Sequence, residues 1–119
     1  MNAYTKERLN KIELSYTKDK KIEILISPGY GAGWSTWNNQ SINLAVDKRI
    51  IDFFKKNGKD VEKEKLKDFL NSIGYNDVYV GGWKKLVIRK VSPNERFRID
   101  EYDGSESLIP YGEDEIWEL

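Results

Sequence analysis

Alternation of apolar and polar positions predicts strands on both sides of a central helical region. Residues 11–16 and 21–27 alternate in this way, with the period of a half-buried strand. A short polar connection joins the two runs, so we expect them to pair as a hairpin. Residues 85–91 and 96–102 repeat the pattern on either side of a Ser-Pro-Asn-Glu turn cluster and predict a second hairpin, with a brief extension at 107–110.

The middle of the chain carries apolar residues at helical spacing. A first helix is expected to start at Asp47 and to stop at the Asn57-Gly58 pair. A second is expected between a cap at Asp60 and a stop at Gly74. Two helices joined by a few polar residues predict a helical hairpin. The expected fold class is therefore α+β: an antiparallel sheet of about four to five strands with the helical hairpin packed on one face.

Length and composition limit the architecture and the chemistry. The 119 residues suffice for one domain spanning residues 1–119, with 110–119 as a candidate flexible acidic tail. The sequence has no Cys and no His, which excludes disulfides, a Ser-His-Asp triad and zinc bound by Cys or His. No apolar run approaches the roughly 20 residues of a membrane span. Because the polar start also lacks a signal-peptide core, we expect a cytoplasmic protein without membrane association.

The formal net charge of zero hides a gradient along the chain. Residues 1–94 contain 18 basic and 11 acidic residues, whereas residues 95–119 contain 2 basic and 9 acidic ones. The acidic end either folds back on the basic body or presents an acidic face to a basic partner, such as a nucleic-acid-binding enzyme. Direct binding of nucleic acid is not expected, because the acidic end would oppose it.

The loop at residues 28–40, after the second predicted strand, is rich in glycine. It lacks the Gly-Lys-Ser/Thr ending of a Walker loop and the glycine spacing of a dinucleotide-binding loop. Backbone N–H groups in such a turn can nevertheless bind an anion without any named motif. Ordinary phosphate binding is therefore kept as an alternative for this loop.

The same loop concentrates aromatic side chains. Tyr30, Trp34 and Trp37 lie within it, beside Asn38, and Trp83 follows a Gly-Gly pair further along the chain. The indoles either cover the core, where Trp is usually mostly buried, or form a recognition surface on which Asn and Ser side chains supply hydrogen bonds. In the second case the ligand is a protein, or a nucleotide or sugar held between Trp34, Trp37 and Trp83.

The densest acidic stretch contains Asp100, Glu101, Asp103 and Glu106. It fails the EF-hand pattern, because apolar residues occupy the first and last ligand positions. The alternatives are a polar turn after a strand, a face for a basic partner, and a magnesium site built from a few carboxylates. No recognised nucleophile motif is present in the sequence, so enzymatic activity is not expected.

Three strings of the sequence, at residues 29–38, 81–83 and 97–106, resemble small proteins encoded by phages and prophages. The resemblance covers residues 24–108. It implies a small accessory protein that binds and blocks, or redirects, a host enzyme or a defence system, CRISPR effectors included. It transfers no catalytic or binding residue.

The leading hypothesis is a non-enzymatic accessory protein of this type, which inhibits or redirects a host protein in the host cytosol. No cofactor and no metal is expected. The alternatives are a binding protein for a nucleotide or sugar and a divalent-metal-dependent enzyme built on Asp100, Asp103 and Glu106. The expected binding residues come from the aromatic loop, the Gly-Gly-Trp string and the acidic stretch: Tyr30, Trp34, Trp37, Asn38, Trp83, Asp100, Glu101, Asp103 and Glu106.

Overall fold

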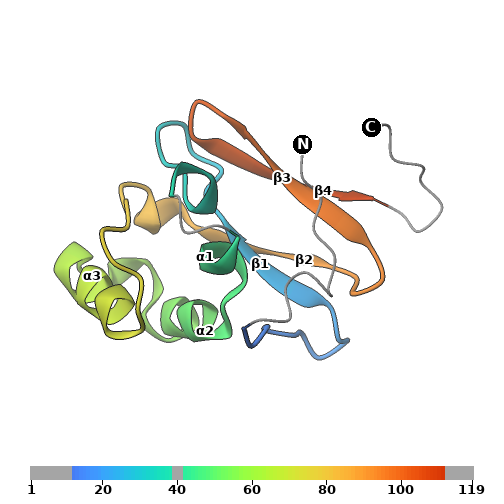
Figure 1. Ribbon diagram of the computed structural model, residues 1–119, viewed down its shortest axis with the longest axis horizontal. Helices are drawn as coiled ribbons and strands as arrows, with labels where there is room; N and C mark the ends of the chain where they lie inside the picture. Colours follow the sequence, from blue (N-terminus) through green and yellow to red (C-terminus); the bar gives the residue numbers. More distant parts are fainter. Residues whose placement is uncertain (1–11, 39–41, 112–119) are drawn as a thin grey trace.

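The computed structural model describes residues 12–38 and 42–111, and it has an α+β architecture (Figure 1). Strand β1 (Ile22–Ile26) pairs antiparallel with β2 (Val87–Val91), and β3 (Arg96–Tyr102) pairs antiparallel with β4 (Ser105–Tyr111). Within this part of the chain, each sheet has two strands. The expected single sheet of four to five strands is therefore replaced by two separate sheets.

The first predicted hairpin is reduced to isolated contacts, and the second does not form. The run before β1 forms isolated bridges only, Leu14 with Asp47 and Tyr16 with Ile22. Strand β2 pairs with β1 instead of with β3, although a short turn joins β2 to β3. All five residues of β1 are buried, so this strand needs cover on both faces. An alternating pattern marks the faces of a strand, but it does not identify the strand that shares its hydrogen bonds.

The β3–β4 hairpin is closed by the two-residue turn Asp103-Gly104. Both residues have positive φ, 49° and 85°, as a tight hairpin turn of the Asn-Gly or Asp-Gly kind requires. The predicted strand at residues 96–102 ends directly before this pair. The same pair is a strong hairpin signal, and it explains why β3 takes β4 as its partner.

The helical region follows the predicted pattern more closely. Helix α1 (Asn43–Val46) is a single turn, and helix α2 (Lys48–Asn57) begins after Asp47, whose carboxylate accepts the Arg49 N–H at 2.9 Å. Gly58, with φ of 66°, ends α2 and confirms the expected stop. Helix α3 (Lys63–Ser72) starts after Glu62, not Asp60.

Asp60 lies in a short 3₁₀ turn, η3 (Gly58–Asp60), so it does not act as the expected helix cap. The two longer helices touch through Phe53 and Phe69, whose rings stack with centroids 4.2 Å apart. Within residues 12–38 and 42–111, no helix has both the length and the apolar character needed to cross a membrane.

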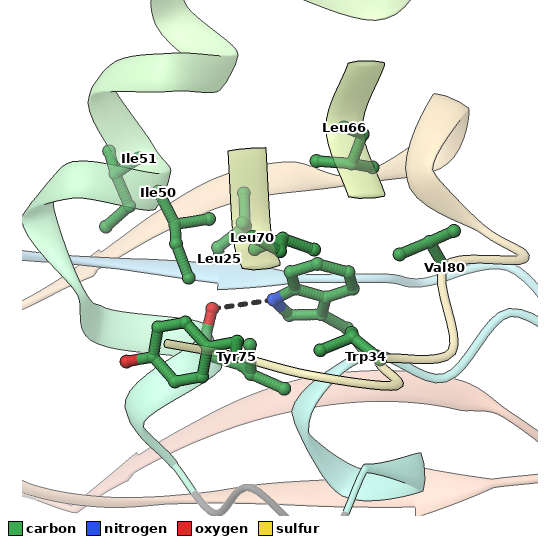
Figure 2. Packing of buried hydrophobic residues seen from close by; sticks show 10 residues of the cluster. Leu25, Trp34, Ile50, Ile51, Leu66, Leu70, Tyr75 and Val80 are labelled. Atoms are coloured by element: carbon green, nitrogen blue, oxygen red, sulfur yellow. Dashed lines mark hydrogen bonds between the residues drawn. The ribbon is translucent and has the colours of Figure 1, made fainter. Parts of the chain in front are cut away.

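Two apolar cores lie on opposite faces of β1. Ile22, Ile24 and Ile26 pack with Phe97 of β3 in one of them. The other, which we call the helix-side core, joins Leu25 to the helices and contains Ile50, Ile51, Leu66, Leu70, Trp34 and Tyr75 (Figure 2). The molecule therefore has three layers, with α2 and α3 on one side of β1–β2 and the β3–β4 hairpin on the other (Figure 1). The short helix α1 contributes side chains to both cores.

The candidate tail at 110–119 begins inside the fold, because Pro110 pairs with Phe97 in the β3–β4 ladder. Residues 112–119 of that tail, and Lys11 of the first predicted strand, lie outside the described residues.

Candidate functional site

The glycine-rich loop lies directly against the β3–β4 turn, which is distant in sequence. The Gly31 N–H donates to the Asp103 carbonyl at 2.7 Å, and the Ser105 hydroxyl donates to the Pro28 carbonyl at 2.7 Å. A side chain at Gly104 would bring its Cβ to 2.7 Å from the Gly31 nitrogen, so the close approach of the two backbones requires glycine there. The two segments expected to contact a partner are thus neighbours in space.

The buried carboxylate of Glu106 holds the loop in this position. Its side chain is 1% exposed and accepts backbone N–H groups from Ser27 at 2.9 Å, Trp34 at 3.0 Å and Thr36 at 3.1 Å. The Thr36 hydroxyl donates to the same carboxylate. Converging backbone N–H groups form an anion-binding concavity, and here the anion comes from the chain itself. Because the Glu106 carboxylate already accepts these backbone N–H groups, the glycine-rich loop need not bind phosphate.

Trp34 and Asn38 are also buried, so they do not contribute to an exposed binding surface. Trp34 is 1% exposed and lies in the helix-side core, where its indole N–H donates to the Leu44 carbonyl at 2.6 Å (Figure 2). The Asn38 amide donates to the Trp34 and Tyr79 carbonyls and accepts the Tyr79 N–H at 2.7 Å. Trp34, Asn38 and Glu106 are the three expected binding residues that are buried.

Four aromatic side chains remain exposed beside the loop. Tyr30 and Tyr102 are 71% and 76% exposed and meet edge to face, with ring centroids 6.3 Å apart. Trp37 and Tyr79 lie with centroids 5.5 Å apart, and the Tyr79 hydroxyl donates to the Gly31 carbonyl at 2.9 Å. Among the described residues, these are four of the five large hydrophobic side chains that are exposed.

The Glu101 carboxylate borders these rings, and Asp103 lies in the adjoining turn. The Glu101 carboxylate accepts the Gly104 N–H at 2.7 Å and the Trp37 indole N–H at 3.1 Å. These two hydrogen bonds, the Gly104 N–H first, lower the pKa of Glu101 below its ordinary value and keep it ionised. We call the combined feature the aromatic–acidic surface; it consists of Tyr30, Trp37, Tyr79, Glu101, Tyr102 and Asp103.

An open groove runs beside this surface, between the loop and the β3–β4 hairpin. Its lining is aromatic, acidic and hydroxyl-bearing, with one aliphatic residue: Tyr30, Tyr102, Asp100, Glu101, Thr36, Ser105, Ser107 and Ile99. The Asp100 carboxylate is paired with Arg98, at 2.6 Å between Arg98 Nε and Oδ1. No Lys or Arg contributes to the lining, so the groove itself carries negative charge only.

Trp83 lies away from this surface. Its indole N–H donates to the Val61 carbonyl at 2.9 Å, and its ring packs against the helix-side core. Trp34, Trp37 and Trp83 thus have different surroundings: the core interior, the aromatic–acidic surface and the helical side. These positions give no support to a ligand held between the three indoles.

The carboxylates considered for a metal site do not converge. In the β3–β4 ladder Asp100 is opposite Ser107, whereas Glu106 is opposite Glu101. Asp100 and Glu106 therefore project to opposite faces of the hairpin. Within the described part of the chain, no group of three or more acidic residues is arranged to hold a metal ion.

Sequence reasoning missed two residues of the site, Thr36 and Tyr79. Thr36 donates its backbone N–H and its hydroxyl to the Glu106 carboxylate. No local sequence pattern indicates a hydrogen-bond partner seventy positions away. Tyr79 precedes Gly81, where a Cβ would lie 2.2 Å from the Tyr79 hydroxyl, so the ring lies close to this backbone. The close approach requires glycine at position 81.

Comparison with known proteins leaves the site to be interpreted by its own geometry. No protein-family model matches the chain, and no curated protein or solved structure is similar to it.

Proposed function

We propose that this chain is a non-enzymatic binding protein of the phage accessory type, which inhibits or redirects a host protein in the cytosol. The candidate targets are defence proteins, CRISPR effectors included, and nucleic-acid enzymes. The observation that carries the proposal is the convergence of the aromatic loop and the acidic turn in one exposed surface.

The exposed rings favour binding to a protein. Tyr30 and Tyr102 leave most of their area in water, although each could bury a large apolar surface in a complex. Tyr and Trp are enriched among the residues that dominate binding energy, because they are large, rigid and amphipathic. Clustering four such rings on one side of a small domain is costly in water and useful at an interface.

The surface is also held in shape before any partner arrives. Glu106 accepts backbone N–H groups of the loop, and the Tyr79 hydroxyl donates to the Gly31 carbonyl of the same loop. The Glu101 carboxylate joins Trp37 of the loop to Gly104 of the turn. A preformed surface loses less conformational entropy on binding, so more of the contact energy appears as affinity.

The acidic contribution is narrower than the sequence alone suggested. Glu106 is buried, so Glu101 and Asp103 carry the exposed charge of the turn. Replacing Glu106 would disturb the loop as well as the charge, and it therefore makes a poor test of binding. The exposed tyrosines are the better positions to change.

The test is affinity capture from bacterial lysate with the wild-type chain, with Tyr30→Ser/Tyr102→Ser, and with Tyr16→Ser. Tyr16 is the matched control, because it is an exposed tyrosine outside the aromatic–acidic surface. We expect one stoichiometric protein partner with the wild type and the control, and binding weakened about 100-fold in the double variant. The free energy of unfolding of the double variant should stay within about 0.5 kcal/mol of wild type.

Full retention of the partner by the folded double variant would contradict the proposed surface. A bound small molecule without any protein, released on denaturation and identified by mass spectrometry, would replace the proposal by the small-ligand alternative.

A further inference from the structure

We infer that the groove beside the aromatic–acidic surface receives an arginine side chain of the partner, whose guanidinium contacts the Tyr30 and Tyr102 rings and the Glu101 carboxylate. This inference rests on the proposed function, since it names the chemistry by which that surface recognises a protein. It identifies the partner as one that exposes arginine, as a phosphate-binding surface does.

The first argument is charge. Within residues 12–38 and 42–111, neither Glu101 nor Asp103 takes part in an ion pair, and no cationic side chain lines the groove. Asp100 already has Arg98 as its partner. A cation entering the groove therefore meets the Glu101 carboxylate, which forms no ion pair with a cationic side chain of the described residues.

The second argument is the edge-to-face arrangement of Tyr30 and Tyr102. The rings stand at 82° to each other, both line the groove together with Glu101, and both are largely exposed, so their aromatic surface is open to a ligand. A planar guanidinium stacks on such a face, whereas the compact ammonium of lysine gains its attraction mainly as a point charge. The geometry thus favours arginine over lysine.

The third argument is the number of hydrogen-bond acceptors. A guanidinium has five N–H donors, and a partly buried one needs acceptors for most of them. Besides its carboxylates, the groove presents the hydroxyl oxygens of Ser105 and Ser107. Ser105 donates its proton to the Pro28 carbonyl, which leaves its oxygen lone pairs to accept. The Arg98–Asp100 pair on the adjoining strand shows the bidentate geometry that a second arginine would reproduce, with distances of 2.6 and 3.2 Å.

The experiment uses the full chain with blocked hexa-arginine and hexa-lysine peptides as probes. Titration calorimetry measures affinity, and amide chemical shifts locate the binding site. We expect hexa-arginine to bind about fivefold more tightly than hexa-lysine and to shift the amides of residues 30–37 and 100–107. Tyr30→Ser/Tyr102→Ser should weaken hexa-arginine binding about tenfold and remove the preference over lysine.

Asp103→Asn tests the charge with a closely matched control. Asp103 has φ of 49°, which asparagine also tolerates, so the substitution removes the charge and keeps the turn. Asp77→Asn is the control, because Asp77 is another exposed aspartate with positive φ, 57°, next to α3. We expect Asp103→Asn to weaken hexa-arginine binding about threefold and Asp77→Asn to leave it unchanged.

Equal affinity for the two peptides, or shifts located elsewhere, would overturn the arginine assignment. If the peptides fail to bind while a lysate partner is still captured through Tyr30 and Tyr102, the proposed function stands and only this inference falls. If the peptides fail and capture is also insensitive to both tyrosines, the surface has neither role.

Discussion

The helix-side core and the loop–turn region are built by different physical means. In the core, Leu66 and Leu70 of α3 pack against Leu25 and Ile50, and all four side chains are essentially inaccessible to water. Near the loop, a buried carboxylate and a set of backbone hydrogen bonds hold Tyr30 and Tyr102 in positions where they remain in solvent. The first region gains stability from apolar burial, and the second uses polar anchoring to keep apolar rings outside.

The difference shows how a small domain can separate stability from recognition. Apolar packing is non-directional and tolerates adjustment, whereas hydrogen bonds to one carboxylate fix a loop in a single shape. A change in the core should therefore lower stability and leave the surface geometry intact in the molecules that remain folded. A change at Glu106 should disturb both.

The largest effect is expected from Glu106→Ala. Removing the carboxylate leaves the N–H groups of Ser27, Trp34 and Thr36 without their acceptor in a buried place. Each unpaired group costs about 1–3 kcal/mol, so we expect a loss of about 4 kcal/mol in the free energy of unfolding, measured with denaturant.

Added formate sharpens this test. Formate can accept the backbone N–H groups that lose the Glu106 carboxylate, so it should raise the Tm of Glu106→Ala while leaving the Tm of the wild type unchanged. The isosteric Glu106→Gln, which keeps one oxygen acceptor, should lose less stability than Glu106→Ala. Equal stability of wild type and Glu106→Ala would show that the carboxylate does not hold the loop.

Leu66→Ala is expected to have the next largest effect. Leu66 is fully buried in the helix-side core, and its truncation should lower the free energy of unfolding by about 3 kcal/mol through lost burial and a residual cavity. Formate should not raise the Tm of this variant. If folded molecules of Leu66→Ala bound the partner as weakly as Glu106→Ala does, the proposed separation between core and surface would be wrong.

A smaller, pH-dependent effect is expected from Tyr75→Phe. The Tyr75 hydroxyl donates to the buried Asp47 carboxylate at 2.8 Å. Burial alone would raise the pKa of Asp47, but hydrogen bonds from Arg49 and Tyr75 lower it below its ordinary value. Losing the hydrogen bond from Tyr75 should lower the free energy of unfolding by about 2 kcal/mol near neutral pH.

The direction of the pH dependence follows from the lowered pKa. The stability that ionised Asp47 contributes is present above the pKa of the unfolded chain and is lost as the pH falls through the folded pKa. The difference in free energy of unfolding between wild type and Tyr75→Phe should therefore become smaller on acidification from about pH 7 to about pH 3. Unfolding curves at several pH values measure it, and a gap independent of pH would show that the hydroxyl does not act through Asp47.

Local patterns predicted the helices and the strand positions well. The spacing of apolar residues and the Asn57-Gly58 stop identified α2, because those signals act within a few residues of one another. The pairing of β2 with β3 was predicted wrongly, and the first hairpin is present only as isolated contacts. The edge to which β2 binds is decided by the whole fold and not by the short turn that joins β2 to β3.

The candidate site was predictable in its parts and not in its assembly. The aromatic loop and the acidic stretch were identified separately from their composition. Nothing local indicates that Glu106 turns inward while its ladder neighbour Glu101 stays exposed. The fold makes this distinction through donors from Trp34 and Thr36, some seventy residues earlier in the chain.

The anchoring of the loop by Glu106 makes the aromatic–acidic surface a late product of protein synthesis. Glu106 lies on the last described strand, so a growing chain cannot hold the loop until that strand has left the ribosome and paired with β3. Contacts between such distant segments close late, because they require the largest loss of chain entropy. A chain truncated before Glu106 would thus lack the anchored loop, and under the proposed function it would not bind its partner.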